Sequence, residues 1–227
     1  VTPLTNGTSY LFRVAAVNAV NTGDYSAESA PVTPMTFASS PAAPVGTSGN
    51  GLVNLSWTAP AANGSPISDY KIQFRTNVSG SSWSIFNDGV SATASTIVTP
   101  LTNGTSYLFR VAAVNAVGVG AYSGESNSVI PMTVTAAPTS LVGTFGNAQV
   151  SLSWNAPLSI GGSAISDYAI EYSSNSGTSW TSFAHAASTT TAATVTSLSN
   201  GTSYLFRVAA VNGAGTGAFV QSVAIIP

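Results

Sequence analysis

Cysteine is absent from this chain of 227 residues, and charged side chains make up only 5% of it. The lack of cysteine excludes disulfide bonds, cysteine-ligated zinc, iron–sulfur clusters and thiol catalysis. The charged fraction is far below the share of about a quarter that is usual in globular proteins. The polar surface must therefore come from serine, threonine, asparagine, glycine and the main chain, and copies packed side by side would meet little Coulomb resistance.

Positive charge is also scarce and scattered. The formal net charge is −2, and the basic residues are Arg13, Lys71, Arg75, Arg110 and Arg207. This distribution predicts no binding to nucleic acid. No stretch approaches the roughly 20 apolar residues of a membrane helix, so we expect no membrane insertion within this segment. No basic and apolar leader stands at residue 1, so a signal peptide or anchor is expected outside the segment.

What the sequence has instead is a long internal repeat. Residues 4–18 recur unchanged as residues 101–115. They recur again as residues 198–212, with Ser199 in place of threonine as the one change. The spacing is 97 residues both times, which is too long for a solenoid unit and suits a whole small β domain.

This period divides the chain into three segments. Residues 37–133 and 134–227 are each a complete repeat, whereas residues 1–36 match only its C-terminal part, strands F and G. Two of seven strands cannot bury their apolar face alone. Two explanations stay open: the chain is a window on a longer array, or strands of a neighbouring molecule complete residues 1–36 and thereby produce oligomers or filaments.

Apolar residues alternate with polar ones in the manner of β-strands. Val53, Leu55 and Trp57 alternate with polar neighbours, and Tyr107 and Phe109 begin the longest such run. Asn-Gly turn signals separate the runs, and no amphipathic helix is visible. The pattern predicts an all-β fold of tandem seven-stranded antiparallel β-sandwiches.

The ordered set of motifs resembles the fibronectin type III repeat, an immunoglobulin-like sandwich. The motifs are the prolines Pro41 and Pro44, residues 53–60, residues 67–70 and residues 101–115. The resemblance covers nearly the whole chain, in two full copies and one partial copy. Near-identical copies, low charge and many small residues resemble the multi-repeat secreted and surface proteins of bacteria.

The resemblance implies structural roles for two groups of aromatic residues. In that family a tryptophan of strand B lies in the core, which here implies Trp57 and Trp154. A tyrosine corner binds its hydroxyl back to the preceding loop, a role that falls to Tyr10, Tyr107 and Tyr204. The Arg-Gly-Asp triplet used for integrin recognition in the family is absent from this F–G loop.

Trp83 and Trp180 form a possible binding surface. They stand at equivalent places near strand C′, where an exposed tryptophan can stack on a sugar or anchor a protein. The other interpretation is an edge aromatic packed on its own sheet. The F-strand arginines are expected to point outward and to lie on an aromatic face.

No pattern predicts a catalytic, cofactor-binding or metal site. His185 is the single histidine, and the aligned residue in the other complete repeat is Asp88, so the two copies share no triad. Asp69 and Asp167 are equivalent residues of separate repeats and cannot form one acid–base pair; we expect them to cap the start of a strand after its loop or to form a hydrogen bond to the main chain. Asp24 and Glu28 supply too few ligands for calcium, and in the next copy Ala121 replaces Asp24.

These observations predict a non-enzymatic structural segment of a long extracellular or cell-surface protein, a spacer, stalk or filament-forming adhesive array. The proline-bracketed junction at residues 131–138 indicates a semi-rigid connection. The expected partners are other copies of the protein or neighbouring repeats. The alternative is an accessory module that binds a surface glycan or a protein, within a secreted polysaccharide-degrading enzyme or a phage fibre.

Overall fold

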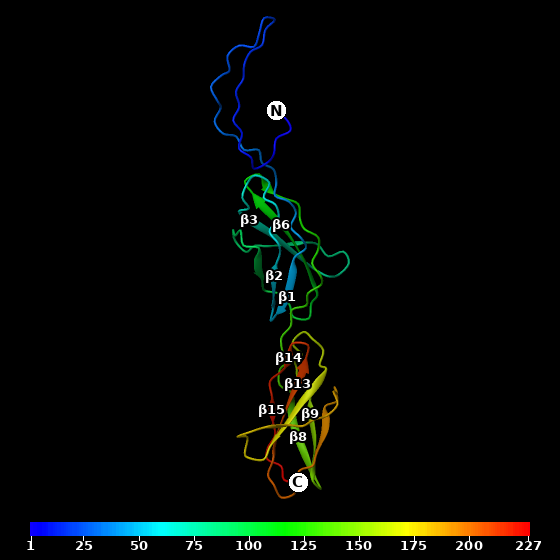
Figure 1. Cartoon of the computed structure of the whole chain (residues 1–227). Helices are drawn as coiled ribbons and strands as arrows, with labels where there is room; N and C mark the ends of the chain where they lie inside the picture. Colours follow the sequence, from blue (N-terminus) through cyan, green and yellow to red (C-terminus); the bar gives the residue numbers. More distant parts are fainter. The chain divides into compact units, whose positions relative to one another are not determined.

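The computed structural model describes all 227 residues, and every regular element in it is a β-strand (Figure 1). The chain divides into two compact units. The first holds most of residues 1–129, and the second holds residues 130–227 with two short loops of the preceding repeat. Each complete repeat is described below by itself.

The repeat at residues 37–133 forms two sheets. The first sheet has the order β1-β2-β5, with strands Val45–Gly49, Leu52–Ser56 and Ser95–Val98. The second has the order β4-β3-β6-β7, with strands Ser84–Phe86, Asp69–Thr76, Tyr107–Asn115 and Gly118–Val119. In the second sheet β3 is antiparallel to both β4 and β6.

The repeat at residues 134–227 has the same arrangement. Its first sheet, β12-β9-β8, contains strands Ala192–Thr196, Gln149–Asn155 and Thr139–Gly146. Its second sheet, β11-β10-β13-β14, contains strands Thr181–Ser182, Asp167–Ser173, Leu205–Asn212 and Gly215–Thr216, with β15 (Val220–Gln221) also paired to β13. The predicted all-β fold of tandem antiparallel sandwiches is confirmed.

The core follows from the period-two pattern. On β9 the residues alternate between exposed and buried, and Val150, Leu152 and Trp154 are the buried ones. On β13 the corresponding inward residues Phe206 and Val208 are wholly buried. The buried core of this repeat consists of Val150, Leu152, Trp154, Tyr168, Ile170, Val195, Leu198, Tyr204, Phe206, Val208, Ala210 and Ile225. Burial of this apolar surface is the main force that stabilises each sandwich.

Residues 1–36 pair with one another but leave most of their side chains exposed. Tyr10 and Val32 form a β-bridge, and Phe12 O accepts the Ser29 N–H at 2.8 Å. These contacts repeat those of the F and G regions in the complete copies. Val14 is 73% exposed, whereas its equivalent Val111 is fully buried. The assignment of residues 1–36 to part of a repeat stays a prediction.

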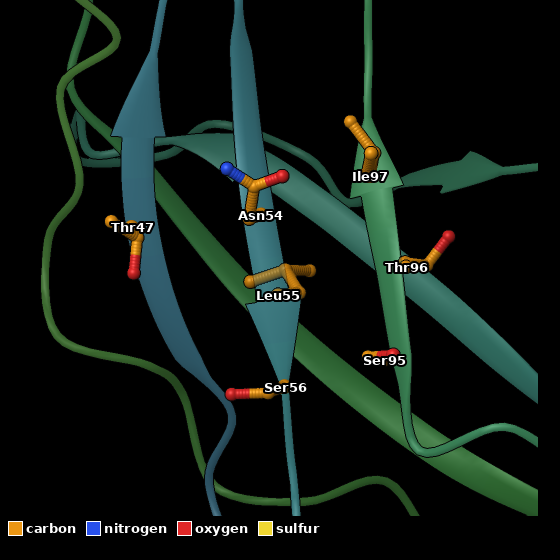
Figure 2. Close-up of a pocket in the computed structure, with 7 residues that line it drawn as sticks. All are labelled: Thr47, Asn54, Leu55, Ser56, Ser95, Thr96 and Ile97. Carbon is orange, nitrogen blue, oxygen red and sulfur yellow. The ribbon is translucent and has the colours of Figure 1, made fainter.

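The charged residues of the strands lie in only one sheet of each sandwich. The strands of β1-β2-β5 and β12-β9-β8 contain no charged residue. Every charged strand residue lies on β3, β6, β10 or β13. Figure 2 shows the uncharged face in the first complete repeat, where Thr47, Asn54, Ser56, Ser95 and Ile97 line a shallow hollow.

Candidate functional site

An arginine between two aromatic rings lies on the charged sheet of the repeat at 37–133. The guanidinium carbon of Arg110 is 4.3 Å from the ring centroid of Trp83 and 4.6 Å from that of Tyr122. Arg110 points away from the core because its neighbour on β6, Phe109, is fully buried. Its Nε donates to Gln73 Oε1 at 2.8 Å. Each ring contact contributes about 0.5–1 kcal/mol at such partly exposed positions.

The other complete repeat contains the same stack. The guanidinium carbon of Arg207 is 4.3 Å from the ring centroid of Trp180 and 4.5 Å from that of Phe219. Its Nε donates to Glu171 Oε2 at 2.6 Å. A carboxylate here replaces the amide of the first copy, so the hydrogen bond becomes charge-assisted and stronger. The stack therefore tolerates a phenylalanine for tyrosine and a glutamate for glutamine.

Arg75 adds a second cation to the first copy of the stack. Its guanidinium carbon is 5.2 Å from the Trp83 centroid, and Nη2 donates to both carboxylate oxygens of Glu125 at 3.1 and 3.2 Å. In residues 1–36, Arg13 lies over Tyr25 at 4.3 Å. The arginine of the repeated Tyr-Leu-Phe-Arg motif therefore pairs with an aromatic ring at each of the three places where the motif occurs.

Trp83 and Trp180, the possible binding surface, directly precede the C′ strands β4 and β11. Both are half-buried, and each has an arginine over its ring. Stacking on a sugar requires an open ring face. Arg110 takes one face of the Trp83 ring and Arg207 one face of the Trp180 ring, so each tryptophan packs on its own sheet, and a role in binding stays a prediction.

The strand-B tryptophans differ in burial. Trp154 is 4% exposed and lies within β9, whereas Trp57 follows the end of β2 and is half-buried. Their rings meet Tyr70 and Tyr168 edge to face, at centroid distances of 5.0 and 5.1 Å. Edge-to-face contact is a favourable arrangement of aromatic rings. Trp154 is a core residue, and Trp57 lies at the margin of the core because β2 ends at Ser56, directly before it, whereas β9 continues to Asn155.

The three tyrosines of the predicted corner occupy equivalent places. Tyr10 Oη accepts the Thr5 N–H at 2.9 Å, and Tyr204 Oη accepts the Ser199 N–H at 3.1 Å. The hydrogen bond from Thr5 lowers the pKa of Tyr10. Tyr107 is 7% exposed, as is Tyr204. The bond from the hydroxyl back to the preceding turn fixes the start of strand F in the manner of a tyrosine corner.

An asparagine of the Asn-Gly-Thr turn fastens that turn to the A–B turn, which is the turn between β1 and β2 in the first complete repeat and between β8 and β9 in the second. The sequence analysis did not identify this contact. Asn103 Oδ1 accepts the Gly51 N–H at 2.8 Å, and its Nδ2 donates to Asn50 Oδ1 at 2.8 Å. Asn200 makes the same two bonds, to Ala148 N and to Asn147 Oδ1. The repeated sequence offered one clue, because the asparagine is unchanged in all copies. The positive φ of this turn requires only the glycine that follows, so the asparagine is kept for another reason.

The equivalent aspartates Asp69 and Asp167 hold the start of strand C (β3 or β10) to the loop before strand E (β5 or β12). Asp69 Oδ1 accepts the Ser91 N–H at 3.1 Å, and Lys71 Nζ donates to Oδ2 at 2.6 Å. Burial alone would raise the pKa of Asp69, but these hydrogen bonds outweigh it and hold the pKa below its ordinary value. Asp167 Oδ1 accepts the Ser188 N–H at 3.0 Å, with His185 Nδ1 at 3.9 Å.

The titratable groups do not gather into a metal or catalytic centre. No cluster of three or more histidine, aspartate or glutamate side chains has the geometry to hold a metal ion. No helix long and apolar enough to cross a membrane is present. The absence of a cofactor site and of catalysis stays a prediction.

Comparison with known proteins gives a family and several relatives. The family model of the fibronectin type III domain matches residues 43–129 and 136–226. Human Myomesin-2 is 31% identical over 226 residues, which cover 94% of this chain and 15% of Myomesin-2. The M-protein of striated muscle from Gallus gallus is 32% identical, with the same shares. Slow-type myosin-binding protein C from Rattus norvegicus is 29% identical over 71% of this chain and 29% of its own length.

A solved structure agrees in fold. The crystal structure of the chicken CNTN1 FN1–FN3 domains has a TM-score of 0.50 and 20% identity, over 97% of this chain and 76% of that one. At this identity the likeness concerns the fold alone. The chain spans about 15% of the length of the first two relatives.

The comparisons correct the predicted location. An extracellular or cell-surface location was expected from the resemblance to secreted bacterial arrays. The relatives are animal proteins named for striated muscle and for myosin binding, so the extracellular prediction is wrong. Low charge and near-identical copies misled because they describe how a repeat array is built and carry no information on the compartment.

Proposed function

This chain belongs to the fibronectin type III family, and on that premise we propose that it is a non-catalytic spacer segment of a longer protein. One observation carries the proposal. The distinctive side chains recur in both complete repeats and bind partners within their own repeat: the arginine between aromatic rings, the turn asparagine and the strand-C aspartate. Because these polar side chains bind partners that stabilise the sandwich, they are not available for a chemical reaction.

The relatives support a structural role. Myomesin-2 and the myosin-binding proteins C match this chain over most of its length. Since the chain covers a small part of each, we take from them the class of protein and not a particular partner. A structural repeat protein of this class binds other proteins, so we propose a protein partner for this chain: a neighbouring repeat, another copy or a filament protein.

The junction supports a semi-rigid connection. Residues 131–138 begin and end with proline and contain neither glycine nor serine. Proline restricts the main chain of its own residue and of the one before it. A linker of this composition bends less than a glycine–serine tether.

A distance measurement tests the spacer function. The chain has no cysteine, so one exposed serine in each repeat, Ser79 and Ser174, can be changed to cysteine and spin-labelled without competition. We expect a narrow distance distribution. In a control variant, glycine and serine replace residues 132–137, and the distribution should broaden. Equal breadth in both proteins would contradict the semi-rigid spacer.

A binding measurement addresses the alternative of a glycan-binding module. A glycan array is probed with the chain and with the Trp180→Ala variant. We expect no glycan to bind the unaltered chain, because Trp180 is half-buried and stacks with Arg207 of its own sheet. Binding that the variant loses would replace the spacer proposal with the carbohydrate-binding one.

A further inference from the structure

The edge strand β12 lacks the features that usually protect an exposed edge. It is the outer strand of the β12-β9-β8 sheet. Natural edges avoid pairing with other chains through lysine, proline, a bulge or very short strands. No charged residue and no proline occurs between residues 186 and 206. The strand reads Ala-Ala-Thr-Val-Thr, and threonine and valine favour extended structure.

Each of the other sheet edges of the two sandwiches is shorter than β12, irregular or flanked by proline. The edge strands of the charged sheets, β4, β7, β11, β14 and β15, have two or three residues each. Strand β8 is irregular between Thr139 and Val142, and β1 follows the prolines Pro41 and Pro44. Strand β5, the equivalent of β12, is followed by Pro100 after one residue, where the second repeat has Ser197.

The main chain of β12 presents groups without a main-chain partner at this edge, and one of them, the Ala192 carbonyl, accepts the Thr190 hydroxyl at 3.3 Å. Trp154 N–H donates to Thr191 O at 3.0 Å, and hydrogen bonding alternates along an antiparallel pair. The main-chain groups of Thr194 and Thr196 therefore point away from β9. The Thr194 hydroxyl lies 3.3 Å from Ser151 Oγ on the outer face, which holds the side chain flat against its own sheet and leaves the edge open.

We propose that β12 is a docking edge for β12 of a second copy, in antiparallel pairing about a two-fold axis at Thr194. In this register Thr194 faces its own equivalent, and Ala192 faces Thr196. Any charge on a self-pairing strand would stand close to its own copy, and like charges opposite one another are destabilising. This edge carries no charge, and threonine pairs across strands favourably.

A second copy fits this edge better than an unrelated chain does. The two-fold arrangement uses the same surface on both molecules, as symmetric dimers do. The pairing would continue the three-stranded sheet of one molecule into that of the other. It depends on neither the spacer function nor the arginine stack, which lies on the other sheet.

The test is the concentration dependence of the mass of the whole chain, by analytical ultracentrifugation. We expect a reversible dimer. Thr194→Lys should raise its dissociation constant by about tenfold or more, since two ammonium groups would face each other. Thr194→Pro removes the outward N–H without touching the bonds to β9, and edge strands accept proline; it should have the same effect.

Thr144→Lys is the matched control. Thr144 is exposed on β8, in the same uncharged sheet but at its opposite edge, so this variant should dimerise like the unaltered chain. Amide exchange adds a direct observation: exchange at Thr194 and Thr196 should slow as the concentration rises. Three outcomes would overturn the proposal: a monomer at all concentrations, a dimer unaffected by Thr194→Lys in a folded protein, or equal loss in the Thr144→Lys variant.

Discussion

Asn200 Oδ1 accepts the main-chain N–H of Ala148 at 2.7 Å, although the two residues are 52 positions apart in the sequence. The bond joins the Asn-Gly-Thr turn to the A–B turn. We expect Asn200→Ala to lower the free energy of unfolding by about 1 kcal/mol, the usual net value of one such hydrogen bond. Urea unfolding measures the change.

Asn6→Ala is the control for this prediction. Asn6 has the same turn sequence, but residues 1–36 contain no A–B turn for it to bind. The variant should unfold like the original chain. Equal loss in both variants would contradict the role assigned to the asparagine.

The two copies of one phenylalanine should differ in their contribution to stability. Phe206 is wholly buried, so Phe206→Ala should lower the free energy of unfolding of its repeat by about 3–5 kcal/mol. Phe12 occupies the same motif position but is only half-buried. Phe12→Ala should cost less than about 1 kcal/mol, because surface substitutions away from special features have small effects. Calorimetric scans of both variants decide whether burial or the motif itself sets the cost.

Replacement of Arg207 should loosen the ring stack. Arg207→Ala should cost about 1–2 kcal/mol, since two cation–π contacts are lost together with the bond to Glu171. Arg207→Lys keeps the charge but loses the planar group, so it should not restore full stability. Arg13→Ala removes one ring contact and should cost less. Chemical denaturation of each variant gives these values; complete rescue by lysine would show that charge alone matters.

The free energy of unfolding should fall at acid pH, because protonation of Asp69 removes the stabilisation that its carboxylate provides. Its pKa in the folded chain lies below the ordinary value of 3.8. A carboxyl of lowered pKa stabilises the fold above its unfolded pKa, and this contribution is lost as the pH falls through the folded pKa. The bond to Asp69 raises the pKa of Lys71, so the lysine contribution is lost only in strong alkali.

Asp69→Asn should flatten the acid limb of a plot of unfolding midpoint against pH. Asp24→Asn provides the control, because Asp24 lies in an exposed loop without an ion-pair partner. An acid limb unchanged by Asp69→Asn would refute the assignment.

Much of the fold could be predicted from local pattern. The alternation at Val150, Leu152 and Trp154 identifies a half-buried strand without any knowledge of its partner. The outward position of Arg207 follows in the same way from its place between Phe206 and Val208. The alternation of apolar and polar residues determines which side chains lie on each face of a strand. The apolar faces of the two sheets then pack against each other to form the sandwich.

Pairings between distant residues could not be predicted in this way. Nothing local to Asn200 indicates a bond to Ala148, because that contact depends on how two turns meet at one end of the sandwich. The second ring over Arg207, that of Phe219, likewise depends on the path of the chain after β14. The position of β12 at the edge of its sheet follows from the strand order, which cannot be read from any single stretch of the sequence.

The confinement of the charged strand residues to one sheet has a consequence for how such arrays change length. Within the repeat at residues 37–133, three basic residues (Lys71, Arg75 and Arg110) accompany three acidic ones (Asp69, Asp88 and Glu125), and the hydrogen bonds of their side chains stay inside the repeat. Duplication or deletion of this repeat would therefore add or remove an electrically neutral part, whereas the repeat at residues 134–227, with Asp167, Glu171 and Arg207, carries a formal charge of −1 with neutral histidine. Copies of the first kind can be added without changing the formal net charge of the chain.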